Sequence, residues 1–339
     1  MTESEYAFRG GDYRISVVVP MHNEEESIRL FFDTLEPVLK ALECDYEIIC
    51  VNDGSRDQTL KLLNNENRRN PSVKVIDLTR NFGKEAALTA GLDFATGDCV
   101  VPIDADLQDP PALIPRMVEE WQHGYDVVLA IRADRKSDTL TKRATAGLFY
   151  QLMGKIGEIE LTANSGDFRL MDRRVIEALR QLPERTRFMK GLFAWLGFRQ
   201  TSVHYSRPER AAGTTKWNYW KLWNFALEGI LSFSTLPLRI WTYIGVLVSA
   251  FAGTYALIII GKTLFFGQDV AGYPSLMVAI LFFSGVLMVG LGVIGEYLGR
   301  IFIEVKQRPI YLVRDVRGFS LKESGDSGQV YKHAKTVSQ

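Results

Sequence analysis

The stretch Cys99-Val100-Val101-Pro102-Ile103-Asp104-Ala105-Asp106-Leu107-Gln108-Asp109 places acidic residues directly after an apolar run. An apolar run that ends in polar residues is typical of a buried β-strand whose end opens on the protein surface. Asp104 and Asp106 stand two apart, so both carboxylates can face one cleft, and such hard oxygen ligands suit Mg²⁺ or Mn²⁺ bridging a diphosphate. The alternative is that Asp104 only caps a helix beginning at Pro110, with Asp106 in solvent.

Three earlier segments are also short apolar runs that end in or are followed by polar residues; they are Ile15–Pro20, Glu47–Asn52 and Val73–Leu78. Segments with helical spacing separate these apolar runs. Four strands separated by helices predict an α/β fold with a mostly parallel sheet. In such sheets the ligand site lies at the carboxyl ends of the strands, which is where the polar motifs fall.

Two further polar motifs follow predicted strands. In Asn52–Ser55, Gly54 permits a tight turn, and Asp53 could accept hydrogen bonds from a base N–H or a ribose hydroxyl. In Pro20–Glu24, Asn23 and Glu24 could contact nucleotide. Each motif alone could also be a turn or a helix cap, but three polar strand ends together favour one nucleotide site.

Two segments near the carboxyl end, Ile240–Phe266 and Tyr273–Leu298, are long and almost free of charge. Each exceeds the ~20 apolar residues needed to span a bilayer core, so the sequence predicts two transmembrane helices. The short connector Gly267–Gly272 carries no cation. Basic residues instead flank the outer ends of the two spans, which predicts that both termini are cytoplasmic. These basic residues are Arg239 before the first span and Arg300, Lys306, Arg308, Arg314 and Arg317 after the second.

The segments that flank the spans mix aromatic, apolar and basic residues. Trp217–Trp223 and Ile301–Leu312 are therefore predicted to lie at the membrane surface, with ordinary surface helices as the alternative. The predicted layout is a catalytic domain over residues 1–216, an interfacial region over 217–238, two spans within 239–299, a juxtamembrane basic segment over 300–318 and a disordered tail over 319–339.

Composition narrows the function. Forty basic and forty acidic side chains cancel, and no basic run is present, so nucleic acid is not expected as a partner. Cys44, Cys50 and Cys99 show neither metal-ligand nor disulfide spacing, which favours a reducing compartment. The polar stretch Met1–Asp12 is not a secretory signal, so the amino-terminal domain is expected in the cytoplasm. The histidines, including His22 and His204, show no zinc spacing.

These motifs together resemble a known family. Val17–Glu25, Val51–Asp57 and Asp104–Asp106 are similar in order and spacing to family 2 glycosyltransferases with the GT-A fold. The likeness extends over roughly residues 14–312. Further motifs resemble the polyprenyl-phosphate branch related to dolichyl-phosphate mannose synthase, and within it the bactoprenol glucosyltransferases; these are Arg80–Glu85, Ser165–Leu170, Arg210–Lys216, Phe188–Gly191, Trp220–Trp223 and Gly295–Arg300.

The resemblance implies a donor site and a divalent metal, Mg²⁺ or Mn²⁺. Lys84 can supply compact positive charge to a diphosphate, although a lysine in such a turn can also be merely solvated. The implied metal residues are Asp106 and Gln108. The implied nucleotide-sugar residues are Pro20, Asn23, Glu24, Asp53, Lys84 and Asp104.

The resemblance also implies an acceptor site. Asp167, together with Asp104 and Asp106, is a catalytic candidate; the alternative is a structural aspartate paired with Arg169. Arginine offers forked donors to phosphate oxygens, so cations near these motifs are candidates for the acceptor phosphate, with surface ion pairs as the alternative. These cations are Arg132, Arg169, Arg210 and Lys216.

The expected activity is inverting transfer of a hexose, glucose from UDP-glucose, to undecaprenyl or another polyprenyl phosphate for O-antigen-type modification of lipopolysaccharide. The expected location is the bacterial inner membrane, as a homo-oligomer. Another sugar donor remains an alternative. A processive polysaccharide synthase would carry a Gln-x-x-Arg-Trp motif and more spans, and a non-catalytic scaffold would be expected to lose Asp104, Asp106 or Asp167.

Overall fold

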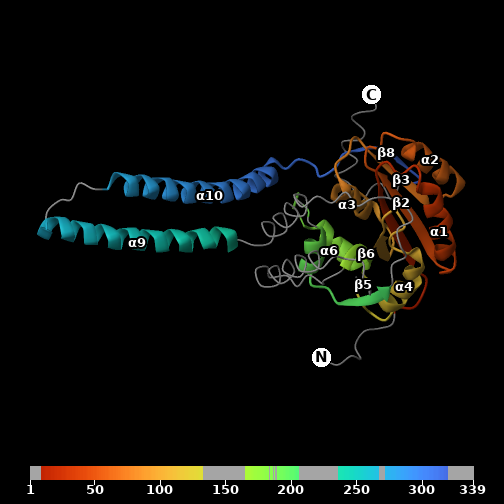
Figure 1. Ribbon diagram of the computed structural model, residues 1–339. Helices are drawn as coiled ribbons and strands as arrows, with labels where there is room; N and C mark the ends of the chain where they lie inside the picture. Colours follow the sequence, from red (N-terminus) through yellow and green to blue (C-terminus); the bar gives the residue numbers. More distant parts are fainter. Residues whose placement is uncertain are drawn as a thin grey trace.

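The computed structural model describes residues 9–132, 165–182, 184–185, 187, 189–205, 236–266 and 272–319. Within these residues the chain forms one sheet covered by helices, and two long helices that extend away from it side by side (Figure 1). The sheet has eight strands in the order β7-β5-β6-β4-β1-β2-β3-β8. The termini of the long helices nearest the sheet lie on one side of it, so the molecule has a globular end and a rod-like end.

The centre of the sheet is the part predicted from sequence. β1 (Arg14–Met21), β2 (Asp45–Asn52), β3 (Val73–Leu78) and β4 (Cys99–Pro102) all run parallel. Their side chains are buried on both faces, which explains why they read as near-continuous apolar runs. This confirms the prediction of an α/β fold with a mostly parallel sheet.

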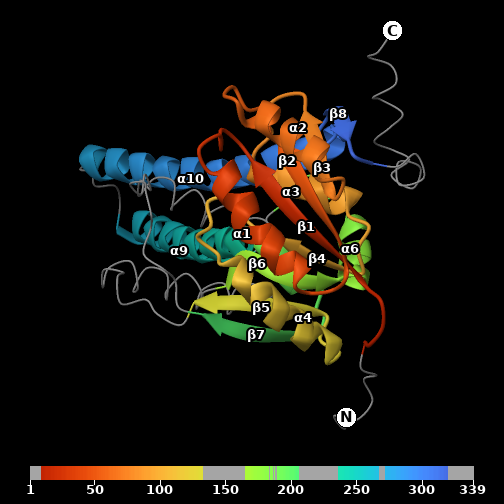
Figure 2. The same cartoon turned by 90° about the vertical axis from the view of Figure 1, so that its right-hand side faces the viewer.

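Four strands complete the sheet and were not predicted. β6 (Ser165–Asp172) runs antiparallel between β4 and β5 (Val127–Arg132), and β7 (Gln200–Tyr205) pairs parallel with β5. β8 (Val313–Arg317) forms the opposite edge, antiparallel to β3. Figure 2 shows β5 and β7 at one edge and β8 at the other.

Helices cover both faces. One apolar layer lies under α1 (Ile28–Lys40), α2 (Thr59–Arg69) and α4 (Ile114–Gln122), which follows the short 3₁₀ turn η1 (Pro111–Leu113). The other lies under α3 (Lys84–Phe94), α6 (Arg173–Arg180) and α7 (Met189–Trp195). The two layers sandwich the sheet (Figure 1).

α3 is the helix that matters most for the site, and it packs unusually close to the sheet. Its residues are buried almost all round. A Cβ at Gly91 would lie 2.2 Å from Val18 Cγ1, so only glycine allows this approach of α3 to β1. The close packing holds the first residue of α3, Lys84, beside the ends of the central strands.

The two long helices are α9 (Leu236–Phe266) and α10 (Tyr273–Lys306). Within the described residues, one segment is long and apolar enough to cross a membrane, Phe282–Lys306 in α10, and only 6% of its most apolar window is buried inside the protein. Tyr243–Tyr255 in α9 forms a shorter apolar helix. The prediction of two spans is therefore supported for one helix, and the second stays a prediction.

The segment after the second predicted span differs from the expectation. Residues 300–318 were predicted as one juxtamembrane segment, and Ile301–Leu312 as an interfacial element. Instead α10 continues to Lys306, and the chain then joins the sheet as β8. A short, mostly charged segment such as Val313–Arg317 carries little local strand signal, because an edge strand depends on the partner strand that it pairs with. Trp217–Trp223 lies outside the described residues, as does the chain after Phe319.

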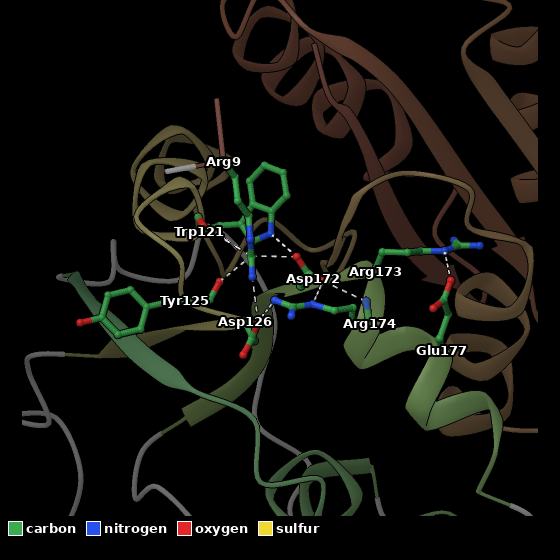
Figure 3. A network of polar contacts seen from close by, with 8 residues as sticks. All are labelled: Arg9, Trp121, Tyr125, Asp126, Asp172, Arg173, Arg174 and Glu177. Atoms are coloured by element: carbon green, nitrogen blue, oxygen red, sulfur yellow. Dashed lines mark hydrogen bonds and ion pairs between the residues drawn. The ribbon is translucent and has the colours of Figure 1, made fainter. Parts of the chain in front are cut away.

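A dense polar network lies at the end of the sheet where the central parallel strands begin (Figure 3). Arg9 Nη1 lies 2.7 Å from Asp172 Oδ2, and its Nη2 lies 2.8 Å from Asp126 Oδ1. The indole of Trp121 donates to Asp172 at 2.8 Å, and Arg174 Nη2 donates to Asp126 at 2.6 Å. This network joins the chain before β1 to α4, β5, β6 and α6, at the end of the sheet opposite the polar strand ends.

Candidate active site

The polar strand ends converge on one pocket, as predicted from their positions in sequence. The register pairs Met21 of β1 with Asn52 of β2, and Val18 with Pro102 of β4, so the carboxyl ends of these strands lie level. The pocket has a volume of about 350 Å³. Its lining residues are Pro20, Met21, His22, Glu24, Asp53, Asn81, Gly83, Lys84, Ala87, Asp104, Ala105 and Asp106.

One ammonium group bridges two carboxylates at this pocket. Lys84 Nζ lies 2.7 Å from Asp104 Oδ2 and 2.8 Å from Asp167 Oδ2. Partial burial opposes the charged ammonium, but the two carboxylates outweigh it and raise the pKa of Lys84. Lys84 is thus a fixed cation held between β4 and β6, not a solvated turn lysine. The alternative prediction paired Asp167 with Arg169. In the structure, Asp167 Oδ2 instead accepts a hydrogen bond from Lys84.

Asp53 organises the pocket wall. Its Oδ1 accepts from the Phe82 backbone N–H at 2.7 Å and its Oδ2 from Gly83 at 2.9 Å. The side chain lines the pocket and is almost fully buried. We predicted Asp53 as a nucleotide ligand from the turn after β2. In the structure, Asp53 holds the loop that carries Gly83 and Lys84. Each carboxylate oxygen can still accept one further hydrogen bond.

Negative charge gathers at the pocket, where Glu24, Asp104 and Asp106 all belong to the lining. Burial raises the pKa of Glu24, the nearby carboxylates Asp106 and Asp104 raise it further, and the hydrogen bond from Ser27 opposes them. A site that crowds carboxylates in this way favours binding of a cation. The acidic pocket therefore suits a divalent ion as well as the lysine.

The carboxylates fit a divalent ion that shares its coordination with a ligand. Asp104 and Asp106 both line the pocket. Among the described residues, no cluster of three or more histidine, cysteine, aspartate or glutamate side chains has metal-binding geometry. Mg²⁺ is commonly held by one or two carboxylates plus phosphate oxygens and water, so two carboxylates are sufficient for such a site.

The loop after β4 differs from the prediction at Gln108. Its backbone N–H donates to Asp106 Oδ1 at 3.0 Å, Leu107 has a φ of 55°, and the Gln108 side chain is not part of the pocket lining. Asp109 turns inward and accepts from Tyr205 at 2.5 Å. The first residue of the 3₁₀ turn is preceded by Pro110 with no side-chain cap, so the interpretation of Asp104 as a helix cap is wrong.

Asn23 does not line the pocket either. Its φ is 57°, its Oδ1 accepts from the Arg56 backbone N–H at 2.9 Å, and its own N–H donates to Ser55 Oγ at 3.0 Å. Asn23 thus joins the ends of β1 and β2. His22, which was not a predicted site residue, does line the pocket, and its Nδ1 lies 2.8 Å from the Asp53 carbonyl oxygen.

Several lining residues were not predicted, namely Met21, Asn81, Gly83, Ala87 and Ala105. Met21 and Ala105 are neighbours of predicted residues and would follow from strand position alone. Asn81 and Gly83 lie in a loop whose path is set by Asp53, a contact between residues far apart in the sequence. Ala87 lies one helical turn after Gly83, so once the start of α3 is known, Ala87 is expected on the same face as Gly83.

Of the predicted acceptor cations, the two in the described part of the chain, Arg132 and Arg169, do not line the pocket. Arg169 is buried in β6, its guanidinium 4.3 Å from the ring of Phe193, and its Nη2 donates to the Gly166 carbonyl at 2.8 Å. Burial lowers the pKa of Arg169 to about 10, so it stays charged at neutral pH. The prediction that Arg169 meets an acceptor phosphate does not match this inward position. Arg132 ends β5 outside the pocket lining, and Arg210 and Lys216 lie outside the described residues.

A mostly parallel sheet with an acidic, lysine-bridged pocket at the carboxyl ends of its strands is the arrangement of an α/β enzyme that binds its ligand at this edge. Comparison with known proteins names the family. Residues 16–180 match the family described as Glycosyl transferase family 2, and the chain belongs to this family. The protein is a glycosyltransferase with a GT-A-like fold, as the motif resemblance implied.

The relatives extend over almost the whole chain. An uncharacterized glycosyltransferase of Synechocystis is 57% identical over 304 residues, covering 90% of this chain and 96% of that protein. A prophage bactoprenol glucosyl transferase homolog of Escherichia coli is 52% identical, covering 90% and 99%. An uncharacterized glycosyltransferase of Bacillus subtilis is 44% identical, covering 91% and 95%. The similarity to bactoprenol glucosyl transferases is thereby confirmed.

Proposed function

We propose that this glycosyltransferase moves a hexose, glucose from UDP-glucose, onto the phosphate of undecaprenyl or a related polyprenyl phosphate. The observation that carries the proposal is the bridged trio Lys84, Asp104 and Asp167 at a pocket beside Asp106. Similarity to a bactoprenol glucosyl transferase homolog over 90% of the chain supports the lipid acceptor and the sugar. The product would serve surface-glycan modification of the O-antigen type.

The donor diphosphate would lie against the start of α3. Lys84 would supply a compact positive charge there, and because the first turn of α3 has no side-chain cap, its backbone N–H groups would donate to the phosphate oxygens. Asp104 and Asp106 would hold Mg²⁺ or Mn²⁺, which when bound neutralises the charge developing on the departing nucleoside diphosphate. Pro20, Glu24 and Asp53 would line the nucleotide, with Asn23 and Gln108 shaping the loops around it.

Asp167 would act on the acceptor side of Lys84. A phosphate monoester has a second pKa of about 6, so the lipid phosphate is mostly dianionic at neutral pH and needs little deprotonation. Asp167 would orient it or take a residual proton while the phosphate oxygen attacks the anomeric carbon. Attack in line with the departing diphosphate inverts the anomeric configuration. Arg132, Arg210 and Lys216 remain proposed acceptor contacts, and Arg169 would act from behind Asp167 through its charge.

The apolar helices would bring the acceptor to the site. The exposed side chains of α10 and α9 suit hydrocarbon, and both helices would span the bacterial inner membrane with the catalytic domain and both termini on the cytoplasmic side. The lipid tail then stays in the bilayer while its phosphate reaches the pocket. Their exposed apolar surfaces also support a homo-oligomer that packs spans together.

The test is transfer of radiolabelled glucose from UDP-glucose to undecaprenyl phosphate in detergent with Mg²⁺ or Mn²⁺. Wild type is expected to move label into the lipid phase, and Asp106→Ala to lose transfer. Asp33→Ala is the matched control, because Asp33 is an exposed carboxylate of α1 that pairs with Arg29 at 3.9 Å. Transfer only from another sugar nucleotide would correct the donor.

Full activity of Asp106→Ala in the presence of chelator would refute the metal-assisted scheme. Retention of the donor's anomeric configuration in the product, read by NMR, would refute the single displacement. Absence of transfer from every sugar nucleotide would refute the proposed reaction.

A further inference from the structure

The segment that follows α10 is part of the catalytic domain. It lies against Thr79–Phe94, the stretch that carries Lys84 and is called the pocket element below. After Lys306, Gln307 takes a left-handed conformation with φ of 50°, and the chain enters β8 at Val313. β8 pairs with β3, with Ile76 opposite Val316. Figures 1 and 2 both show the segment passing from the long helix to the sheet edge beside β3.

Arg314 holds the start of the pocket loop. Its Nη2 donates to the Thr79 carbonyl at 2.5 Å, and its Nη1 lies 3.3 Å from Asp77 Oδ2. The Thr79 N–H donates in turn to the Leu312 carbonyl at 2.9 Å. Both backbone groups of Thr79 are therefore bound by the segment after α10. Thr79 directly precedes the loop 80–83, which carries two lining residues of the pocket.

Tyr311 holds the far end of the same element. Its hydroxyl donates to Asp93 Oδ2 at 2.7 Å, and Asp93 lies near the end of α3, the helix that begins with Lys84. Burial of Tyr311 and Asp93 raises the pKa of both groups. Phe319 packs edge-on against Phe94 with ring centroids 5.2 Å apart.

Arg185, which follows α6 in the chain, is bonded both to the end of α10 and to the segment after it. The Arg185 backbone N–H donates to Glu304 Oε1 at 2.8 Å, and Arg185 Nη1 donates to the Arg308 carbonyl at 2.5 Å. The residues before β8 are thus bound to the domain as well as to α10. Among the described lining residues of the pocket, none comes from this segment.

We propose that Tyr311 and Arg314 are positioning residues for the donor pocket, which hold the element Thr79–Phe94 by its two ends and so place Lys84 opposite Asp104. Because they follow α10 directly, they also join the donor pocket to the membrane helix. The proposal rests on the proposed function in taking the pocket ligand to be a nucleoside diphosphate sugar.

The experiment measures UDP binding by calorimetry with Mg²⁺ on the full-length protein in detergent. Arg314→Ala and Tyr311→Phe are expected to raise the Kd of UDP roughly fivefold to tenfold, the size seen for substitutions that act through packed contacts. Arg314→Lys should recover part of the loss, because an ammonium can reach Asp77 or the Thr79 carbonyl but not fork between them. In the transfer assay the donor kcat/KM falls while the KM for the lipid stays unchanged.

Two controls separate positioning from general destabilisation. Arg317→Ala removes a cation of the same strand that pairs with Asp315 at 3.0 Å within β8. Arg9→Ala weakens the polar network at the opposite end of the sheet. Both are expected to leave the Kd of UDP at the wild-type value.

Hydrogen exchange on the same variants tests, without any ligand, whether the segment after α10 holds the pocket element in place. Arg314→Ala should speed amide exchange in residues 79–84, and Arg9→Ala should not. Unchanged exchange, unchanged UDP affinity with faster exchange, or an equal loss of affinity in Arg9→Ala would each overturn the proposal. If wild type binds no UDP, the proposed donor fails, while the exchange data still decide whether the segment holds the pocket element.

Discussion

Two lysines lie at opposite ends of the same sheet, and each faces carboxylates at nearly equal distance. Lys74 Nζ lies 2.7 Å from Glu47 Oε2, with side chains 4% and 0% exposed. Lys84 Nζ lies 2.7 Å from Asp104, with side chains 44% and 36% exposed. The Lys74–Glu47 pair is shielded from solvent and its partners all come from the protein. Ser16 and Thr96 donate to Glu47 at 2.5 and 2.9 Å, and the ring of Phe319 lies over the Lys74 ammonium at 4.9 Å.

The difference teaches what makes an ion pair functional. A buried pair with every partner supplied by the protein contributes to stability only through its internal contacts, and losing one member is costly. A pair that borders a cavity and keeps solvent access can exchange its partner for a ligand. Residue types alone do not separate the two cases, but exposure and the neighbouring volume do.

The largest effect is expected from Lys74→Met. It leaves Glu47 buried without its cation, and breaking a buried pair costs about 3 to 5 kcal/mol of unfolding free energy. Chemical denaturation should show this loss, while the Kd of UDP for the folded fraction stays unchanged. The double variant Lys74→Met with Glu47→Gln should recover part of the stability; a double variant no more stable than Lys74→Met would contradict this account of the pair.

The second effect is expected from Lys84→Met. Removing a preorganised charge from the leaving-group side is expected to lower kcat by about 10² to 10³-fold. The melting temperature should change little, because Lys84 is partly exposed and its loss leaves the carboxylates accessible to solvent. Initial rates at saturating donor test the first statement and calorimetric melting the second. A large fall in melting temperature with an unchanged rate would reverse the comparison.

A smaller effect is expected from Gly54→Ala. The new Cβ would lie 2.4 Å from Arg80 C and Asn81 N, and the φ of Gly54 is +62°. Strain of this kind costs on the order of 1 to 3 kcal/mol, and the displaced loop should also weaken UDP binding. Gly11→Ala is the matched control, since Gly11 has a φ of +126° but no atom within 4 Å of its Cβ. Equal loss of UDP affinity in both variants would argue against the role of the close contact.

The smallest effect concerns pH. Burial opposes ionisation of Glu47, but hydrogen bonds from Lys74 and Ser16 prevail and lower its pKa below the ordinary value of 4.5. Its stabilising contribution is therefore complete above pH 4.5 and is lost as the pH falls through the lowered pKa. Urea unfolding from pH 6 down to pH 3 should show wild type losing more stability than Glu47→Gln. Parallel curves for the two proteins would exclude this linkage.

The sequence predicted the central strands because each is buried on both faces and therefore reads as an apolar run. It predicted half of the pocket lining because polar residues at the ends of parallel strands meet at one edge. Pro20, Glu24, Asp53, Lys84, Asp104 and Asp106 all line the pocket. Asn23 and Gln108 lie outside the pocket lining and Arg169 is buried in β6, because the positions of these side chains depend on a left-handed residue, a backbone turn and a buried ring; their roles in binding stay predictions.

The sequence by itself determined the α/β class, the position of the acidic pocket at the strand ends and the apolar character of the last two helices. These follow from local patterns, namely apolar runs, turns and the length of uncharged segments. Only the tertiary structure decided that Lys84 bridges Asp104 and Asp167, that Asp53 holds the pocket loop, and that the chain after α10 returns to the sheet as β8. These features join residues far apart in the chain, and such contacts are set by the packing of the whole domain, which no short motif encodes.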